Sequence, residues 1–185
     1  MEATELAHDL WRWTGRHDET RTEVGSVYYK RGRDVLLFDP LLPPEDPHGF
    51  WTALDRDVLE GDTVHVLLTT PAHRRSAQEM LARYPGAKLW EPAAGDELPA
   101  GVSAHASGCP DEVVYYLPEH RALVVGDVVA GDGEGGLRLG LEADRRGVLE
   151  ALDALEPLPV DIVIPSHGEP VRDAAALQAL VGARH

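Results

Sequence analysis

The spacing of hydrophobic positions predicts strands and helices in the first half of the chain. Three segments with β-rich, partly alternating composition are expected to form a strand meander, and two further short strands follow. These strands span residues 11–13, 25–30, 34–38, 64–68 and 87–90. Hydrophobic residues at helical spacing predict one helix over 48–59 and another from near Ser76 to Tyr84. Gly61 and Pro85-Gly86 end these two helices.

The second half continues as a β-hairpin, a helix, a strand and a closing helix. Its predicted elements are strands at 112–117, 122–125 and 160–164 and helices at 148–155 and 175–181. A flexible glycine-rich loop is expected over 132–136. This mixture predicts an α/β fold in which two sheets are covered by helices, an αββα sandwich. The sequence contains no evident internal repeat, and we predict one domain over residues 1–185.

Composition and charge narrow the classes of function. The 185 residues include 32 acidic and 17 basic ones, a formal net charge of −15 that disfavours nucleic acid and anionic membranes as partners. No apolar run approaches the ~20 residues of a membrane span, and the acidic start at Met1-Glu2 differs from a signal peptide. With a single cysteine the chain cannot form an internal disulfide. We therefore expect a cytoplasmic protein, whose oligomeric state the sequence leaves open.

Polar residues at the ends of hydrophobic runs mark the candidate site. Asp127 and His167 each follow a run that is expected to be a buried strand. His73 lies between a predicted strand and the next helix, and Cys109 lies in a later loop. Imidazole, carboxylate and thiolate groups on short loops at strand ends suit a hydrolytic metal site, in which one position stays open for water.

Three short motifs occur in an order that resembles the metallo-β-lactamase superfamily of metal-dependent hydrolases. They are Leu67-Leu68-Thr69-Thr70, Val125-Gly126-Asp127 and Ile164-Pro165-Ser166-His167-Gly168. The resemblance covers nearly the whole chain and implies the αββα fold. It puts Asp127 at the position of the aspartate that bridges two metal ions and His167 at that of the last histidine ligand. Asp39 matches an aspartate that supports the metal-binding loop from behind.

The sequence departs from the family pattern in its densest group of ligands. The family's strand-to-helix loop carries Thr-His-x-His-x-Asp-His. Aligned without gaps from Thr69, the four ligand positions of that motif fall on Thr70, Ala72, Arg74 and Arg75. A shifted register recovers only His73. The comparison therefore implies that this loop lacks most of the metal donors of its relatives.

A second departure concerns the later loop. The family's His-x-x-Gly-His stretch is here His105-Ala106-Ser107-Gly108-Cys109, so that Cys109 stands at a ligand position. The resemblance then implies either no metal or at most one divalent ion, which would be zinc, iron or manganese. Asp127 and His167 would hold that ion, together with His73 or Cys109.

Asp127 raises the question of what compensates its charge, because a carboxylate at a buried strand end is costly unless it is paired. We hypothesise that Arg74, Arg75 or His73 takes the place of the metal beside it, since a guanidinium offers a carboxylate two parallel hydrogen bonds. The alternative is that both arginines begin a helix and are solvated. Thr70 and Asp39 are assigned to the same pocket.

Alternatives stay open for the remaining residues. His167 either binds metal or hydrogen-bonds the loop that turns after it. Cys109 is a ligand, a reactive thiol or an inert small hydrophobe. We expect His105 to mark the loop rather than to bind a ligand. The tryptophans are predicted to fill the core or a pocket wall; they are Trp11, Trp13, Trp51 and Trp90.

Two functions are compatible with these features. The first is a superfamily protein with an eroded dinuclear site, which binds a small-molecule ligand or a partner without catalysis. The second is a mononuclear metal-dependent hydrolase of a small ester, thioester or lactone, so that the sequence leaves open whether the chain is an enzyme. The number of remaining ligands favours the first. The short chain speaks against the nuclease relatives, which insert a further domain for nucleic acid.

Overall fold

The computed structural model describes residues 3–18, 21–140 and 144–182. Its strands and helices form two compact units, Met1–Glu91 and Pro92–His185. The prediction of a single domain over 1–185 stays a prediction.

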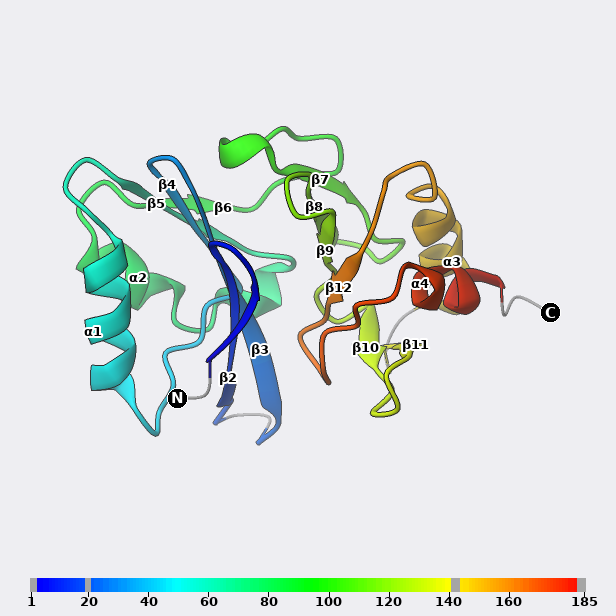
Figure 1. Cartoon of the computed structure of the whole chain (residues 1–185), viewed down its shortest axis with the longest axis horizontal. Coiled ribbons are helices and arrows are strands. Elements are labelled where there is room, and N and C mark those ends of the chain that lie inside the picture. The colour runs from blue at the N-terminus through cyan, green and yellow to red at the C-terminus, as the bar shows by residue number, and fades with distance from the viewer. Residues whose placement is uncertain (1–2, 19–20, 141–143, 183–185) are drawn as a thin grey trace. The chain divides into compact units, whose positions relative to one another are not determined.

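The first unit is built on a six-stranded sheet in the order β1-β2-β3-β4-β5-β6 (Figure 1). Its strands are β1 (Ala3–Ala7), β2 (Leu10–Arg16), β3 (Glu23–Arg31), β4 (Asp34–Phe38), β5 (Thr63–Leu67) and β6 (Lys88–Trp90). The first four are antiparallel neighbours, whereas β4, β5 and β6 run parallel. The carboxyl ends of β4 and β5 therefore meet at one edge, where Asp39 N donates to Leu67 O at 2.9 Å.

Two helices, α1 (Pro47–Asp57) and α2 (Ala77–Arg83), pack on one face of this sheet (Figure 1). The side chains between them form a buried cluster of Trp13, Tyr28, Val35, Leu37, Phe50, Leu54, Val64, Val66, Leu68, Ala77 and Met80. A short 3-10 helix, η1 (Pro71–Arg74), connects β5 to α2. The alternation along β2 and β4 explains this packing, because every second residue faces the helices.

The second unit contains a four-stranded sheet in the order β12-β9-β8-β7. Its strands are β7 (Ser103–Ala106), β8 (Val113–Leu117), β9 (Ala122–Val124) and β12 (Ile162–Ile164). Strands β7, β8 and β9 are antiparallel neighbours, and β12 runs parallel to β9. A separate hairpin pairs β10 (Val129–Gly131) with β11 (Leu137–Leu139), and η2 (Pro99–Gly101) precedes β7.

Helices α3 (Arg145–Asp153) and α4 (Ala174–Gly182) complete the core of the second unit. Its buried cluster consists of Val114, Tyr116, Leu123, Val125, Val128, Val129, Val148, Leu152, Leu155, Val160, Val163 and Leu177. The side chain of Asp144 caps α3 by accepting a hydrogen bond from Gly147 N. This unit thus has its own hydrophobic core, with α3 and α4 packed on its sheet.

The α/β class predicted from the hydrophobic pattern is confirmed. All four predicted helices are present, with boundaries that differ by a few residues. The segment 132–136, which we expected to be a flexible loop, is the turn between β10 and β11, and the sequence analysis missed both of these strands. It also missed β1 and β7. These strands are short and mixed in polarity, and so they lack a clear period-2 signal.

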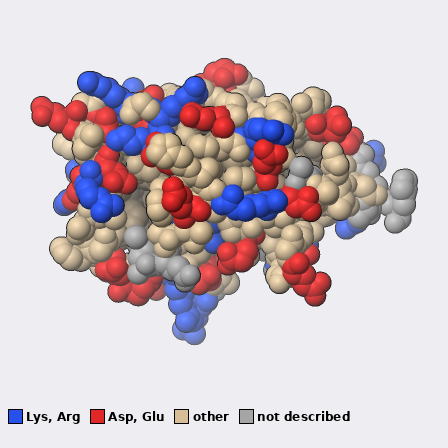
Figure 2. All heavy atoms as spheres, viewed as in Figure 1, with Lys and Arg blue, Asp and Glu red and all other residues tan. Residues whose placement is uncertain are grey.

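Two further features of the described residues are the distribution of charge on the surface and the hydropathy of the helices. Figure 2 shows acidic side chains interspersed with basic ones over one face of the described residues, so the net charge of −15 is spread there rather than gathered in one patch. No helix in the described ranges combines the length and the hydropathy that a bilayer span requires.

Candidate functional site

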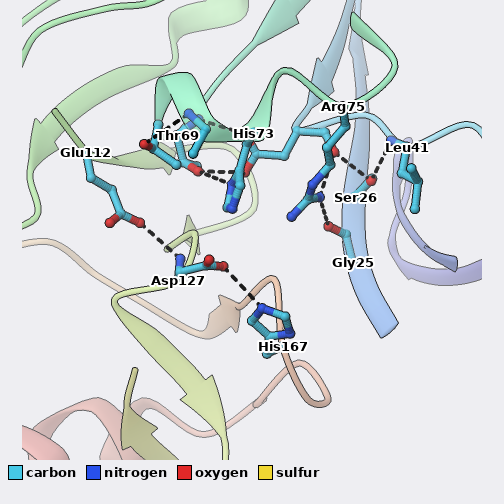
Figure 3. A network of polar contacts seen from close by, with 12 residues as sticks. Gly25, Ser26, Leu41, Thr69, His73, Arg75, Glu112, Asp127 and His167 are labelled. Atoms are coloured by element: carbon cyan, nitrogen blue, oxygen red, sulfur yellow. Dashed lines mark hydrogen bonds and ion pairs between the residues drawn. The ribbon is translucent and has the colours of Figure 1, made fainter. Parts of the chain in front are cut away.

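Asp39 is the centre of a buried polar network in the first unit. It is 2% exposed; its Oδ1 accepts a hydrogen bond from Thr69 N at 2.8 Å, and its Oδ2 accepts one from Thr69 Oγ1 at 2.6 Å. His73 Nδ1 lies 3.0 Å from the same Oδ2 (Figure 3). The tautomer of His73 with its proton on Nδ1 suits this contact, since that nitrogen could then donate to the carboxylate. Asp39 therefore holds the loop between β5 and α2.

The backbone at this site is strained. Asp39 has a φ of +46° and Arg75 has a φ of +31°, both in the left-handed region that residues other than glycine rarely adopt. The Asp39 carbonyl accepts hydrogen bonds from Ser26 Oγ at 2.7 Å and from Arg75 NH1 at 2.9 Å (Figure 3). Such conformations cost ~1–3 kcal/mol each and persist only where the surrounding bonds impose them. The hydrogen bonds from Ser26 and Arg75 thus hold the backbone of Asp39 in this conformation.

The two arginines of the loop have different surroundings. Arg75 is half-buried, and its NH1 also donates to Gly25 O at 3.0 Å. Arg74 forms an ion pair with Glu91, and its side chain is half exposed. Thr70 caps η1, where its Oγ1 accepts a long hydrogen bond of 3.5 Å from Ala72 N. Arg75 therefore belongs to the Asp39 network, whereas Arg74 and Thr70 lie outside it. That an arginine compensates Asp127 stays a hypothesis.

Asp127 and His167 come together in the second unit. Asp127 follows β9 and His167 follows β12, which are parallel neighbours. A hydrogen bond of 2.9 Å from Ser166 N to Gly126 O joins the two strand ends. Asp127 Oδ1 lies 3.6 Å from His167 Nε2 (Figure 3), and the two side chains are 44% and 36% exposed. Parallel pairing explains why residues 40 positions apart in sequence meet at this edge.

The loop that carries His167 depends on a close approach between two glycines. Gly131 N donates to His167 O at 3.0 Å. Gly168 has a φ of +78°, and a Cβ atom there would lie 2.9 Å from the backbone of Gly131. A larger residue at this position would displace the loop, so the close approach of the Gly131 backbone explains why a glycine follows His167.

The Cys109 loop is tied to Asp127 through Glu112. Ser107 Oγ accepts a hydrogen bond from Cys109 N at 3.0 Å and donates to Glu112 O at 2.9 Å. Glu112 Oε1 in turn accepts from Asp127 N at 3.0 Å (Figure 3). The Cys109 side chain packs against the hydrophobic cluster of the second unit, and burial raises the pKa of its thiol. Three loops of this unit therefore lie together, although the thiol itself contacts the core.

His105 lies on β7 rather than in the adjoining loop. Its Nε2 is 2.9 Å from Ser103 Oγ, and burial lowers the pKa of its imidazole, an effect that the charge of Glu97 partly offsets. These contacts are confined to β7 and its neighbours.

Several solved structures share the fold of this chain. VMB-1 is 13% identical, with a TM-score of 0.69 and coverage of 98% of this chain and 94% of that chain. The DIM-1 metallo-β-lactamase is 17% identical, with a TM-score of 0.68 and coverage of 100% and 98%. A metallo-β-lactamase from Erythrobacter litoralis is 16% identical, with a TM-score of 0.65 and coverage of 97% and 90%. At these identities the similarity establishes the fold.

A sequence comparison adds to this structural similarity. Residues 85–167, which include Asp127 and His167, match the sequence model of the metallo-β-lactamase superfamily. The chain therefore has the fold of the metallo-β-lactamases, and its residues 85–167 are similar in sequence to the metallo-β-lactamase superfamily. None of the curated proteins compared with it matches.

The metallo-β-lactamase superfamily typically binds zinc, and the donors present can be tested against that ion. Ligands of a tetrahedral zinc with bonds of ~2.0 Å lie roughly 3.3 Å apart, close to the 3.6 Å between Asp127 Oδ1 and His167 Nε2. A zinc site needs at least three protein donors. Among residues 3–18, 21–140 and 144–182, no three His, Cys, Asp or Glu side chains are grouped to hold a metal ion. The described pair supplies two donors and lacks a third.

The sequence analysis missed Ser26 and Glu112 as functional positions and named Thr69 only as part of a motif. Ser26 and Thr69 are each 1% exposed. Their hydrophobic neighbours in the sequence were the available signal, because a hydroxyl that is buried among them needs a hydrogen-bond partner. Glu112 begins a predicted strand after a polar loop, and its sequence context gives no such signal.

Proposed function

We propose that this metallo-β-lactamase-fold protein does not assemble a dinuclear metal centre and that it binds a small-molecule ligand without hydrolysing it. The observation that carries the proposal is the composition and bonding of the loop after β5. The ligand positions of the family motif are taken by Thr70, Ala72, Arg74 and Arg75. None of these side chains is an imidazole, a carboxylate or a thiolate, the groups that bind zinc.

The chemistry of the arginines supports this proposal. A guanidinium remains protonated, has only hydrogen-bond donors and repels a cation. Arg75 NH1 is committed to the carbonyls of Gly25 and Asp39. The loop is ordered by Asp39, Thr69 and His73 from within the first unit. It therefore has an internal source of order that does not require metal coordination.

The expected ligand is a small molecule because the charge disfavours larger anionic partners. With a formal net charge of −15, the chain repels nucleic acid and anionic membranes at long range. The superfamily relationship does not transfer an activity by itself, since function depends on the site rather than on the fold.

The alternative is a mononuclear metal-dependent hydrolase of a small ester, thioester or lactone. The 3.6 Å distance between Asp127 Oδ1 and His167 Nε2 favours this alternative. Asp127 and His167 would hold the ion, which would act as a Lewis acid and lower the pKa of a bound water. This function needs a third protein donor.

Metal analysis of the full chain purified without chelator distinguishes the two functions. The proposal predicts less than about a tenth of an equivalent of zinc, iron or manganese after incubation with excess zinc and gel filtration. It also predicts no hydrolysis of ester, thioester or lactone substrates. One equivalent of metal that disappears in both Asp127→Ala and His167→Ala would overturn the proposal in favour of the hydrolase. Arg74→Ala serves as the control, because it removes no zinc donor.

The binding half of the proposal has a separate test. Small molecules that raise the melting temperature of the full chain would be recovered unchanged, as mass spectrometry of the incubated mixture can verify. A ligand that stabilises the protein and is cleaved during incubation would contradict the proposal.

A further inference from the structure

The first unit contains a cavity that is separate from the loops described above. It has a volume of about 250 Å³ and lies between α1 and strands β1 to β4. Four aromatic side chains contribute to its wall, namely Trp11, Trp13, Tyr28 and Phe50. Cavities for drug-sized ligands begin at about 300 Å³, so this one suits a smaller molecule or a single head group.

Strand register explains why the aromatic residues meet. Trp11 and Trp13 are two positions apart on β2 and thus face the same side of the sheet. Trp11 is the direct partner of Tyr28 on β3. Phe50 on α1 covers Trp13, with ring centroids 5.4 Å apart and planes tilted by 48°. Three elements therefore present aromatic rings to one space.

The aromatic wall is held rigidly and is accessible from solvent. Trp13 is 4% exposed, and its Nε1 donates a hydrogen bond of 2.8 Å to Leu41 O. Tyr28 is 8% exposed. Trp11, in contrast, is 36% exposed, which is high for so large a hydrophobic side chain. The indole of Trp11 thus offers a solvent-accessible ring at a wall that is otherwise buried.

Carboxylates dominate the charge around this wall. Asp57 lines the cavity, and Glu5 is the direct partner of Trp11 on β1, on the same side of the sheet. Burial raises the pKa of Tyr28, and the charges of Asp57, Asp9 and Asp62 raise it further. Of these carboxylates, Asp57 is the one that lines the cavity.

The basic residues near the cavity are already associated with carboxylates. Arg56 is the one basic residue among the described lining residues; its side chain is 79% exposed, and its Nε lies 3.5 Å from Asp57 Oδ1. Lys30 Nζ is bonded to Asp62 Oδ2 at 2.7 Å. Among the described residues, the guanidinium of Arg83 forms a cation–π contact with the ring of Trp51, and neither residue lines this cavity.

We propose that this cavity binds a small organic cation, with a quaternary or protonated alkylammonium head placed against Trp11, Trp13, Tyr28 and Phe50 and near Asp57. The faces of aromatic rings carry a negative quadrupole that attracts such heads, and several rings around one head are the arrangement that recognises quaternary ammonium groups. An anionic ligand would be repelled by Asp57. The site goes beyond the proposed function because it uses none of the residues in the loops after β5, β9 and β12.

Calorimetric titration of the full chain with matched ligands tests the charge requirement. Choline is compared with its neutral carbon isostere, 3,3-dimethylbutan-1-ol, and with 3,3-dimethylbutanoate, at constant ionic strength. We expect choline to bind about tenfold more tightly than the neutral alcohol, as the cation–π contribution implies. We expect the carboxylate to bind most weakly. Equal binding of choline and the alcohol, or no saturable binding of choline, overturns the proposal.

Variants locate the binding to this cavity. Trp11→Leu keeps a hydrophobic side chain but removes an aromatic face, and Asp57→Asn removes one charge at constant size. Each is expected to weaken choline binding about fivefold or more and to leave binding of the neutral alcohol within about twofold. The matched controls are Trp51→Leu and Asp55→Asn on α1, since neither residue lines the cavity.

The outcome of these variants is separable from the metal test. Trp11 and Asp57 are partly exposed, so both variants are expected to fold, and their melting curves verify this. If choline binds Trp11→Leu and Asp57→Asn as tightly as the unaltered chain, the proposal for this cavity is overturned. That result leaves the metal content, and with it the proposed function, unaffected.

Discussion

The two units differ in how the polar residues at their strand ends are held. In the first unit Asp39, Thr69 and His73 are buried and bonded to one another. In the second unit Asp127 and His167 are each more than a third exposed, and the contact between their side chains is 3.6 Å long. The polar residues at the strand ends of the first unit form a buried network, whereas those of the second unit are partly exposed to solvent.

This difference distinguishes residues that stabilise a loop from residues whose side chains are partly exposed. Asp39 accepts two hydrogen bonds from Thr69 and lies 3.0 Å from His73 Nδ1, so its carboxylate is satisfied within its own unit. The side chains of Asp127 and His167 are each more than a third exposed, although the Asp127 Oδ1 that faces His167 is itself buried. A loop whose support comes from its own unit can keep its conformation without metal, as the proposed function requires of the loop that carries Arg74 and Arg75.

The strongest test of this comparison is the removal of each aspartate in turn. Asp39→Ala leaves buried donors of Thr69 and His73 without an acceptor, and we expect it to lower the free energy of unfolding by about 3 kcal/mol. Asp127→Ala removes a partly exposed side chain and should cost less than about 1 kcal/mol. Urea unfolding followed by tryptophan fluorescence measures both. Equal losses would show that the two strand ends are not held differently.

The arginines provide a second test, with a smaller expected effect. Arg75→Met removes charged hydrogen bonds to the carbonyls of Gly25 and Asp39 and should lower the free energy of unfolding by about 2 kcal/mol. Arg74→Met removes a surface ion pair with Glu91 and should change it by less than about 0.5 kcal/mol. Thermal and urea unfolding of the two variants give the comparison directly. A larger loss for Arg74→Met would contradict the different roles assigned to them.

The sequence predicted those parts of the structure that depend on local pattern. The helices followed from periodic hydrophobic positions, and Asp127 and His167 were selected because each follows a hydrophobic strand. Asp39 was selected through the family resemblance. The three-residue strands β10 and β11 were missed, since three residues are too few to show alternation.

The partners of the selected residues could not be predicted in the same way. Asp39 and Thr69 are 30 positions apart, and they meet because β4 and β5 pair in parallel. Glu112 reaches Asp127 N only because the loops before β8 and after β9 come together. Such contacts depend on strand order and register, which periodicity within one strand does not determine.

The paired threonines offer a finer test within one loop. Thr69→Val removes a buried hydroxyl that donates to Asp39 and should lower the free energy of unfolding by about 1 kcal/mol. Thr70→Val removes only a 3.5 Å hydrogen bond on a partly exposed side chain and should cost less than about 0.5 kcal/mol. Both variants keep a β-branched side chain, so their difference measured by urea unfolding isolates the hydroxyl. Equal effects would mean that the Thr69 hydroxyl contributes nothing to the network.

The smallest expected effect concerns Cys109 in the second unit. Burial raises the pKa of its thiol, so that at pH 7.5 the protein contains a smaller fraction of reactive thiolate than free cysteine does. Alkylation by iodoacetamide should therefore be several-fold slower than that of free cysteine and should accelerate as the pH rises through the raised pKa. Mass spectrometry of timed samples measures the rate.

Added zinc extends this test to the comparison between the two units. If Cys109 packs against the hydrophobic core, as its contacts indicate, zinc should change the alkylation rate by less than about twofold, because the thiol is not at a metal site. A metal-bound thiolate would instead be protected from alkylation, and the protection would disappear in His167→Ala. Strong protection by zinc would make Cys109 the third donor beside Asp127 and His167, and the open strand end of the second unit would then be a metal site.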